Sequence, residues 1–300
     1  MALKILITDL SHPLGQAIEH DLEREHCKLL PMLPNPLEFG AVKAHLRDHK
    51  PDLVINTFGW RDENIDLSAP EMVQAAAHLL AVTEAMGIPN IHFSSYLIFG
   101  SDSKSAHSEK DAPIPLSPLG KSFHQLEQLI EADREKSLVL RLGWVISAAS
   151  NNLFGRLLNA IMTGEPTTLS CRLRGAPTLM SDVARVVVAL AKQIHFGADN
   201  WGVFHYCSGD AVTEAEFGEE LVQLLIQQKL LKQDVNVTIQ DEVSSRLPLS
   251  AVLGCRRIRD AFGVQARSWR PGLLPLVKQW SHDHSLPKKA VDKTASNTEN

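Results

Sequence analysis

The sequence predicts an α/β fold, and two observations lead to this prediction. Short apolar segments rich in Val, Ile and Leu alternate with longer segments of helical periodicity along the first half of the chain. Leu53, Val54 and Ile55 follow one another directly, as expected for a strand that is buried on both faces of a sheet. Together these features predict a Rossmann-type, doubly wound parallel sheet with helices on both faces, accompanied by a smaller α/β lobe.

The first half of the chain contains the predicted sheet and its helices. Apolar segments predict strands at residues 3–7, 28–32, 52–57, 90–95 and 138–142. Helical periodicity predicts helices at residues 14–25, 38–49, 70–87 and 121–134. The third of these helices has well-marked ends, because Ser68 suits the N-cap, Pro70 the first turn and Gly87 the end of the helix.

The sequence pattern changes after about residue 145, which indicates a second lobe and a tail. Residues 1–145 are expected to form the Rossmann-type domain and residues 146–282 the smaller lobe, with the chain crossing between the two. Further helices are expected at residues 151–164 and 180–194 and from Thr213 onward. One strand is expected at residues 201–209. Residues 283–300 have almost no apolar content and are expected to be disordered.

Composition excludes several classes of protein. A net charge of −5 argues against a nucleic-acid partner and against an anionic membrane surface. No apolar stretch approaches the ~20 residues that a membrane span needs, and the apolar start is interrupted by Lys4, so no signal peptide is expected. The four cysteines form no C-x-x-C pair, so we expect neither a zinc site nor a redox pair, and a reduced cytoplasmic location.

The segment TDLSHPLG, residues 8–15, lies between the first strand and the first helix. Dinucleotide-binding proteins carry a glycine-rich turn there, often G-x-x-G-x-x-G, in which glycines let the backbone approach the pyrophosphate. Here only Gly15 remains, while Asp9 and His12 occupy the other two positions. A working site would use Thr8, Leu14 and Gly15. The alternative, which we favour, is a plain strand-to-helix turn capped by Ser11.

Several segments together resemble one family, the dTDP-4-dehydrorhamnose reductases of the extended short-chain dehydrogenase/reductases. The resembling segments, in order, are PDLVIN (51–56), HFSSYLIFG (92–100), EKDAPIPLSPLGKS (109–122), LRLGWVIS (140–147), RGAPTLMSDVAR (174–185), WGVFHYCSGDAVTEAEFGEEL (201–221) and RLPLSAVL (246–253). The resemblance implies an NAD(P)-binding-like first domain and a substrate-binding second lobe. It also implies hydride transfer from NAD or NADP to a keto-sugar nucleotide.

The same resemblance implies a catalytic Tyr-x-x-x-Lys pair, whose spacing places both side chains on one helix face. The chain has two tyrosines and no Y-x-x-x-K anywhere. At the two family positions we read Leu119 and Phe123. Ser94 and Ser95 remain as candidate catalytic residues where the family has its carbonyl-binding serine or threonine. Lys121 is expected to point elsewhere, about 200° around the helix from the lysine position.

The resemblance further implies that cleft arginines bind the diphosphate of a substrate, since arginine binds phosphate oxygens in a bidentate manner. The candidates are Arg141, Arg172 and Arg246. Ordinary surface exposure is the competing interpretation for each of them.

The missing pair leads to a functional hypothesis. We expect a catalytically degenerate protein, a pseudoenzyme with a binding, regulatory or scaffold role, whose partner is a nucleotide sugar or another protein. The regulatory β subunit of methionine adenosyltransferase is a non-catalytic precedent that the resemblance suggests. The alternative is an active NAD(P)H-dependent nucleotide-sugar reductase with relocated acid–base residues, and a weaker one is a nucleotide-sugar isomerase or epimerase.

Overall fold

The computed structural model describes residues 2–61, 65–102, 104–131, 135–148, 152–231 and 235–284. A six-stranded parallel sheet forms its centre, in the order β10-β5-β4-β3-β1-β2. The strands are β1 (Lys4–Ile7), β2 (Lys28–Leu29), β3 (Leu53–Asn56), β4 (Asn90–Ser95), β5 (Ser137–Leu142) and β10 (Gly202–Tyr206). This arrangement confirms the predicted fold class.

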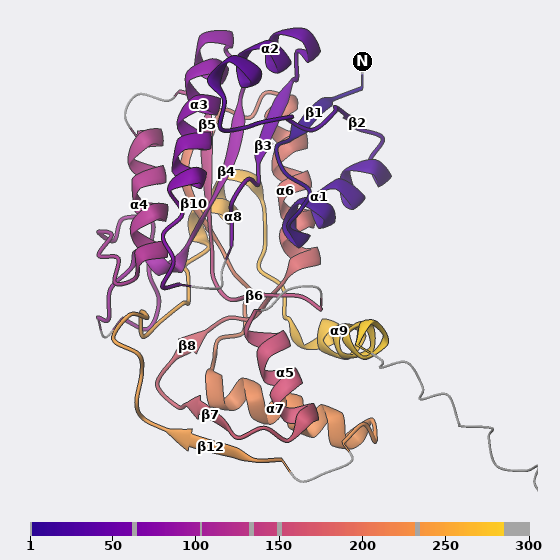
Figure 1. Cartoon of the computed structure of the whole chain (residues 1–300), viewed down its shortest axis with the longest axis vertical. Helices are drawn as coiled ribbons and strands as arrows, with labels where there is room; N and C mark the ends of the chain where they lie inside the picture. Colours follow the sequence, from indigo (N-terminus) through magenta and orange to yellow (C-terminus); the bar gives the residue numbers. More distant parts are fainter. Residues whose placement is uncertain are drawn as a thin grey trace, which may run out of the picture.

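Helices cover both faces of the sheet (Figure 1). On one face α1 (Pro13–Arg24) packs against α6 (Met180–His195). On the other face α3 packs between its two neighbours. The helices of that face are α2 (Phe39–His49), α3 (Pro70–Met86) and α4 (Pro118–Glu131). A short helix, α8 (Arg256–Phe262), packs against the edge strand β10. The consecutive apolar residues of β3 and β5 are buried because both faces are covered.

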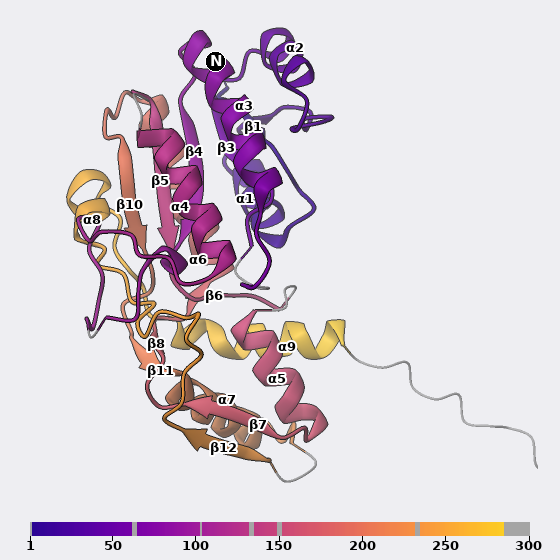
Figure 2. The same ribbon diagram turned by 60° about the vertical axis from the view of Figure 1, so that its left-hand side comes forward.

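The small lobe has its own hydrophobic core, which includes Phe154, Phe217 and Trp269. It lies at one end of the sheet (Figure 2). Its helices are α5 (Leu153–Thr163), α7 (Glu214–Gln227) and α9 (Arg270–Asp283). Its strands pair as β7 (Thr167–Ser170) with β12 (Val237–Gln240), and as β8 (Arg174–Gly175) with β11 (Val212–Thr213). The strands β6 (Val145–Ile146) and β9 (Thr178–Leu179) pair where the lobes meet.

The chain crosses between the lobes several times. After β6 it enters the small lobe, but it returns to the large lobe to build α6, β10 and α8. Helix α9 extends to Asp283, the residue at which the predicted tail begins. The remainder of that predicted tail, beyond His284, lies outside the described residues.

Two predicted helix caps are wrong. The N-cap of α3 is Ala69 rather than Ser68, and the backbone N–H of Ala69 donates to the Ser122 hydroxyl of α4 at 2.9 Å. The N-cap of α1 is His12 rather than Ser11. Helix α4 begins at Pro118, before the predicted start at residue 121. Thr213 caps α7 in a capping box, as its position suggested.

Candidate functional site

The order of the strands reverses at β1, which lies between β2 and β3. Ligands of doubly wound sheets bind outside the carboxyl ends of the strands at such a switch point. Thr8, directly after β1, donates from its hydroxyl to Asn56 Oδ1 at 2.8 Å and accepts from the Thr57 N–H at 3.0 Å. The buried Thr8 hydroxyl therefore joins the ends of β1 and β3.

The turn after Thr8 satisfies two of its own backbone donors with side chains. The Asp9 carboxylate accepts from the Ser11 N–H at 2.8 Å and from the Ser11 hydroxyl at 2.9 Å. His12 Nδ1 accepts from the Leu14 N–H at 3.1 Å, in the first turn of α1. A free helix N-terminus would offer such donors to a phosphate, and Pro13 has no N–H to offer. In this conformation a phosphate would compete with the chain's own groups.

The His12 imidazole is held in place by an aromatic neighbour. Its ring contacts Trp60 edge-on, with 5.2 Å between centroids. Burial lowers the pKa of His12, although the Asp9 charge acts in the opposite direction. A neutral imidazole can accept at Nδ1, which agrees with its role as the cap of α1.

Gly15 has a structural reason to be glycine. A Cβ at this position would lie 2.2 Å from the Asp9 carbonyl oxygen, so only glycine lets α1 pack this closely on the turn. The neighbouring Leu14 is fully buried in the core. The three residues predicted to bind a cofactor thus all lie at the switch point, and each has a packing or hydrogen-bonding role there. The roles of these three residues in binding a cofactor stay predictions.

Helix α4 presents an apolar face where the resemblance places the catalytic pair. Leu119 and Phe123 are both fully buried. A Cβ at Gly120 would lie 2.2 Å from the Leu97 carbonyl oxygen, so this helix packs closely on the segment after β4. Lys121 is exposed, as its angular position predicted. Neither Leu119 nor Phe123 carries a group that can move a proton.

The two candidate serines lie at the carboxyl end of β4. The Ser95 hydroxyl accepts from the Leu97 N–H at 3.3 Å and caps the short helix η1 (Tyr96–Ile98). The Ser94 hydroxyl is buried and has no hydrogen-bond partner among the described residues. Tyr96 is 8% exposed and belongs to the core. Ser95 therefore has a structural role, and its role as a catalyst stays a prediction together with that of Ser94.

The second tyrosine, Tyr206, also has a structural role. The Tyr206 hydroxyl, at the end of β10, donates to Asp182 and accepts from Arg185 Nη2 at 3.2 Å. Burial raises the pKa of this phenol well above its usual value, and the Asp182 carboxylate adds to the effect. Tyr206 therefore holds β10 to α6.

A polar chain that the sequence did not predict crosses the sheet beneath α3 and α4. Asn56 Nδ2 contacts His92 Nδ1 at 3.0 Å and so extends the Thr8–Asn56 bond to β4. Burial lowers the pKa of His92 from 6.5 to about 3. The signal was present in the sequence, since His92 lies between the apolar Ile91 and Phe93, and Asn56 ends an otherwise apolar strand.

Arg141, a predicted diphosphate ligand, is instead buried in a salt bridge. Its guanidinium donates in a bidentate manner to Glu127 of α4, at 2.9 and 2.7 Å, and lies 3.2 Å from His205 Nε2. Arg141 is 2% exposed and Glu127 is 1% exposed. Since its charge is already paired and its side chain is buried, we remove Arg141 from the candidate ligand-binding set. Glu127 continues the buried face of Leu119 and Phe123 at helical spacing, a signal that sequence analysis missed.

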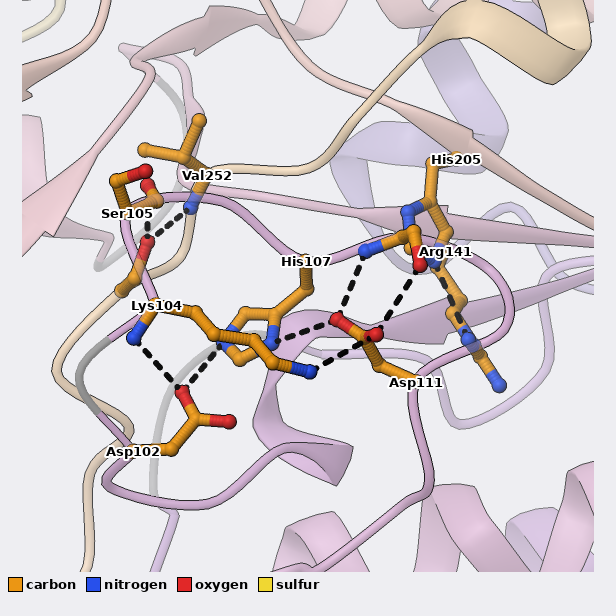
Figure 3. Close-up of polar contacts among 10 residues, drawn as sticks. Asp102, Lys104, Ser105, His107, Asp111, Arg141, His205 and Val252 are labelled. Atoms are coloured by element: carbon orange, nitrogen blue, oxygen red, sulfur yellow. Dashed lines mark hydrogen bonds and ion pairs between the residues drawn. The ribbon is translucent and has the colours of Figure 1, made fainter.

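Beside Arg141, a second polar cluster surrounds His107 (Figure 3). The His107 ring stacks on Phe99 at 4.0 Å and lies between two carboxylates, 4.0 Å from Asp102 and 3.6 Å from Asp111. Lys104 binds Asp111 at 2.9 Å. Hydrogen bonds to Lys104 and Ser108 lower the pKa of Asp111 to about 2 against the opposing effect of its desolvation. These contacts hold the segment from Asp102 to Asp111 together.

The other two arginines that were predicted to bind a diphosphate, Arg172 and Arg246, are exposed. Arg246 Nη1 binds Asp66 at 2.5 Å, and both side chains are more than half exposed. This ion pair joins the loop after β3 to the segment after β12, so Arg246 does face the other lobe. Arg172 is exposed beyond β7. The structure therefore brings neither of these arginines to Arg141, and their binding roles stay predictions.

Comparison with known proteins now decides the family. The chain matches the family model described as RmlD substrate binding domain over residues 3–281. The protein belongs to the RmlD family. Within the described ranges, no helix is long and apolar enough to cross a membrane. The same ranges contain no group of three or more His, Cys, Asp or Glu residues that could hold a metal ion.

Relatives of this RmlD-family chain include proteins with reductase names and proteins named as subunits of methionine adenosyltransferase. A dTDP-4-dehydrorhamnose reductase of Sinorhizobium fredii is 23% identical over 250 residues, which is 79% of this chain and 83% of the relative. The methionine adenosyltransferase 2 subunit beta of Xenopus laevis is 26% identical over 191 residues, which is 61% of this chain and 57% of the relative.

Solved structures share the fold of this chain. A dTDP-4-dehydrorhamnose reductase from Clostridium acetobutylicum superposes with a TM-score of 0.79 at 22% identity, covering 92% of this chain and 99% of the other. The enzyme of that name from Bacillus anthracis, in complex with NADP, has a TM-score of 0.78 at 18% identity, covering 93% and 99%. These similarities establish a common architecture.

Proposed function

We propose that this RmlD-family protein binds a nucleotide sugar in a non-catalytic, regulatory or scaffold role. One observation carries the proposal. The chain contains no Y-x-x-x-K, and the two positions at which the family resemblance places that pair are the fully buried Leu119 and Phe123. Both tyrosines of the chain are buried, at the ends of β4 and β10. General acid catalysis needs a donor within hydrogen-bond reach of the substrate, and α4 supplies none at these positions.

The turn after β1 supports the same proposal. Asp9 places a carboxylate among the donors that a cofactor phosphate would use, and His12 occupies the Leu14 N–H. A solved relative of the same fold is named as a complex with NADP, so weak cofactor binding after rearrangement of the turn is the competing outcome. A regulatory role has a parallel among the relatives, one of which is named as a β subunit of methionine adenosyltransferase.

The first test is an activity assay with the purified protein. We expect no oxidation of NADH or NADPH in the presence of a dTDP-4-keto-6-deoxy sugar, because no residue at the family positions can protonate the carbonyl oxygen. A thermal-shift series with dTDP and UDP sugars measures binding in parallel, since a ligand of the folded state raises the Tm by mass action. A turnover on the order of 1 s⁻¹ would overturn the non-catalytic proposal, and the absence of any shift would overturn the binding proposal.

The second test changes the turn. Replacing Asp9→Gly together with His12→Gly removes one carboxylate and frees the Leu14 N–H. Repulsion between two unit charges at ~5 Å and an effective dielectric of ~20 is about 3 kcal/mol, which corresponds to about a hundredfold in affinity. We therefore expect the double variant to bind NAD(H) or NADP(H) about a hundredfold more tightly than the parent, measured by calorimetric titration, and still to lack reductase activity.

A matched control removes the same residue types from the far end of the same helix. His20→Ala with Asp21→Ala should leave cofactor affinity at the parental value, because both residues lie away from the turn, in the later part of α1. If instead the parent binds a cofactor with micromolar affinity and the glycine variant loses that binding, then Asp9 and His12 belong to a working site.

A further inference from the structure

Two of the four cysteines are neighbours in space. Cys207 directly follows β10, and Cys255 directly precedes α8. They are 48 positions apart in the chain, yet their sulfur atoms lie 3.9 Å from one another. The two cysteines do not form a C-x-x-C motif, so no redox pair was expected from the sequence. The packing of α8 against the edge strand β10 brings the two thiols together.

The backbone around both thiols is held firmly. The Cys207 N–H donates to Cys255 Sγ at 3.3 Å, and both thiols lie within hydrogen-bond distance of the Leu253 carbonyl oxygen, at 3.2 and 3.4 Å. Arg257 of α8 donates to the Val203 carbonyl oxygen of β10 at 2.5 Å and so holds the helix to the strand. The short distance between the sulfur atoms is therefore a consequence of ordered segments on both sides.

The two thiols differ in accessibility and in acidity. Cys207 is 1% exposed, whereas Cys255 is only half-buried, so a soluble oxidant reaches Cys255 first. A hydrogen bond from Cys207 lowers the pKa of the Cys255 thiol, because it stabilises the thiolate. The same interaction together with burial raises the pKa of Cys207. Such a difference is typical of an attacking cysteine and its resolving partner.

We propose that Cys207 and Cys255 form an intramolecular disulfide when the protein meets a peroxide. The Cys255 thiolate attacks one oxygen of hydrogen peroxide, so an S–O bond forms, the O–O bond breaks and the departing hydroxide takes up a proton to become water. The Cys207 sulfur then attacks the sulfenic sulfur of Cys255, so the S–S bond forms and a second water leaves with the Cys207 proton. In total, two thiols and one peroxide give one disulfide and two waters.

The disulfide would join two segments that connect the lobes. After Cys207 the chain leaves β10 for the small lobe, and at Cys255 it returns to α8 of the large lobe. The loop closed by the bond contains β11, α7 and β12, which form much of the small lobe. Cross-linking both ends of this loop restricts the unfolded chain and raises the thermal stability. It also holds together the point at which the small lobe attaches.

The test uses a full-length variant that retains only this pair, with Cys27→Ser and Cys171→Ser. These two cysteines are half-buried and exposed, respectively, so both replacements are tolerated by the fold. After treatment with hydrogen peroxide and removal of the excess, we expect free thiols measured in denaturant to fall from two to zero per chain. Intact mass should fall by about 2 Da through loss of two hydrogens, and a peptide containing both cysteines should appear. The Tm should rise by about 5 °C or more and return with dithiothreitol.

Two further variants on this background separate the proposal from general oxidation. Cys207→Ala should leave a sulfenic acid on Cys255 that reacts with dimedone, and Cys255→Ala should make the remaining Cys207 thiol slow to oxidise. Neither variant should gain Tm on oxidation. The proposal is overturned if the parent pair gains oxygen without losing two hydrogens, or if only disulfides between chains form. It is equally overturned if Cys207 rather than Cys255 is the thiol that forms the dimedone adduct.

Discussion

Replacing Glu127 with alanine should lower the free energy of unfolding by about 3–5 kcal/mol, among the largest effects expected of a single substitution in this chain. The reason is the burial of its partner. Arg141 is 2% exposed, and two of its donors bind the Glu127 carboxylate. Without that carboxylate, a guanidinium charge remains in the core with no opposite charge bound to it. Chemical denaturation of parent and variant, compared at one pH, measures the loss.

A double variant distinguishes the loss of the pair from the loss of packing. Replacing both residues with apolar ones of similar size, Glu127→Leu with Arg141→Met, should recover most of the lost stability, because no buried charge is then left unpaired. The exposed pair Lys192–Glu25 serves as a matched control, with side chains 44% and 46% exposed. Glu25→Ala should leave the Tm almost unchanged. If the Glu127→Ala variant had the same free energy of unfolding as the parent, the salt bridge would not stabilise the fold.

Acidification should destabilise the protein before most carboxylates titrate. Between pH 6 and pH 5 the free energy of unfolding should fall by roughly 2–3 kcal/mol. Burial lowers the pKa of His92 to about 3, and burial together with the Arg141 charge does the same for His205, against an ordinary value of 6.5. Below pH 6.5 the unfolded chain therefore binds protons that the folded chain does not. The stability is fully present above that pH and is lost as the pH falls toward 3.

A single substitution tests the assignment to particular histidines. His92→Gln keeps an acceptor for the Asn56 amide and removes one titrating group. Below pH 6, the free energy of unfolding of this variant should change by about 1.4 kcal/mol less per pH unit than that of the parent. His20→Gln, at an exposed position of α1, should keep the parental slope. A stability that stays constant between pH 7 and pH 5 in the parent would mean that His92 and His205 become protonated in the folded protein.

Much of the fold and part of the candidate site could be predicted from the sequence because the relevant signals are local. Apolar segments located the five strands expected in the first half, although β2 spans only Lys28–Leu29 of the predicted 28–32. In β3 and β5 the consecutive apolar residues are buried because both faces of the sheet are covered. The absence of Y-x-x-x-K is visible in the sequence alone. The burial of Leu119 and Phe123 agrees with their apolar character, because apolar side chains on one helix face pack inward.

Only the tertiary structure decided which polar groups meet. Arg141 was predicted to bind a ligand, but the register of β5 beneath α4 places it on Glu127. The thiols of Cys207 and Cys255 meet because α8 returns to the edge of the sheet. By itself the sequence determined the alternation of strands and helices and the absence of a Y-x-x-x-K motif, since both depend on neighbouring residues. Contacts between distant residues depend on strand order and lobe crossings, which no local pattern encodes.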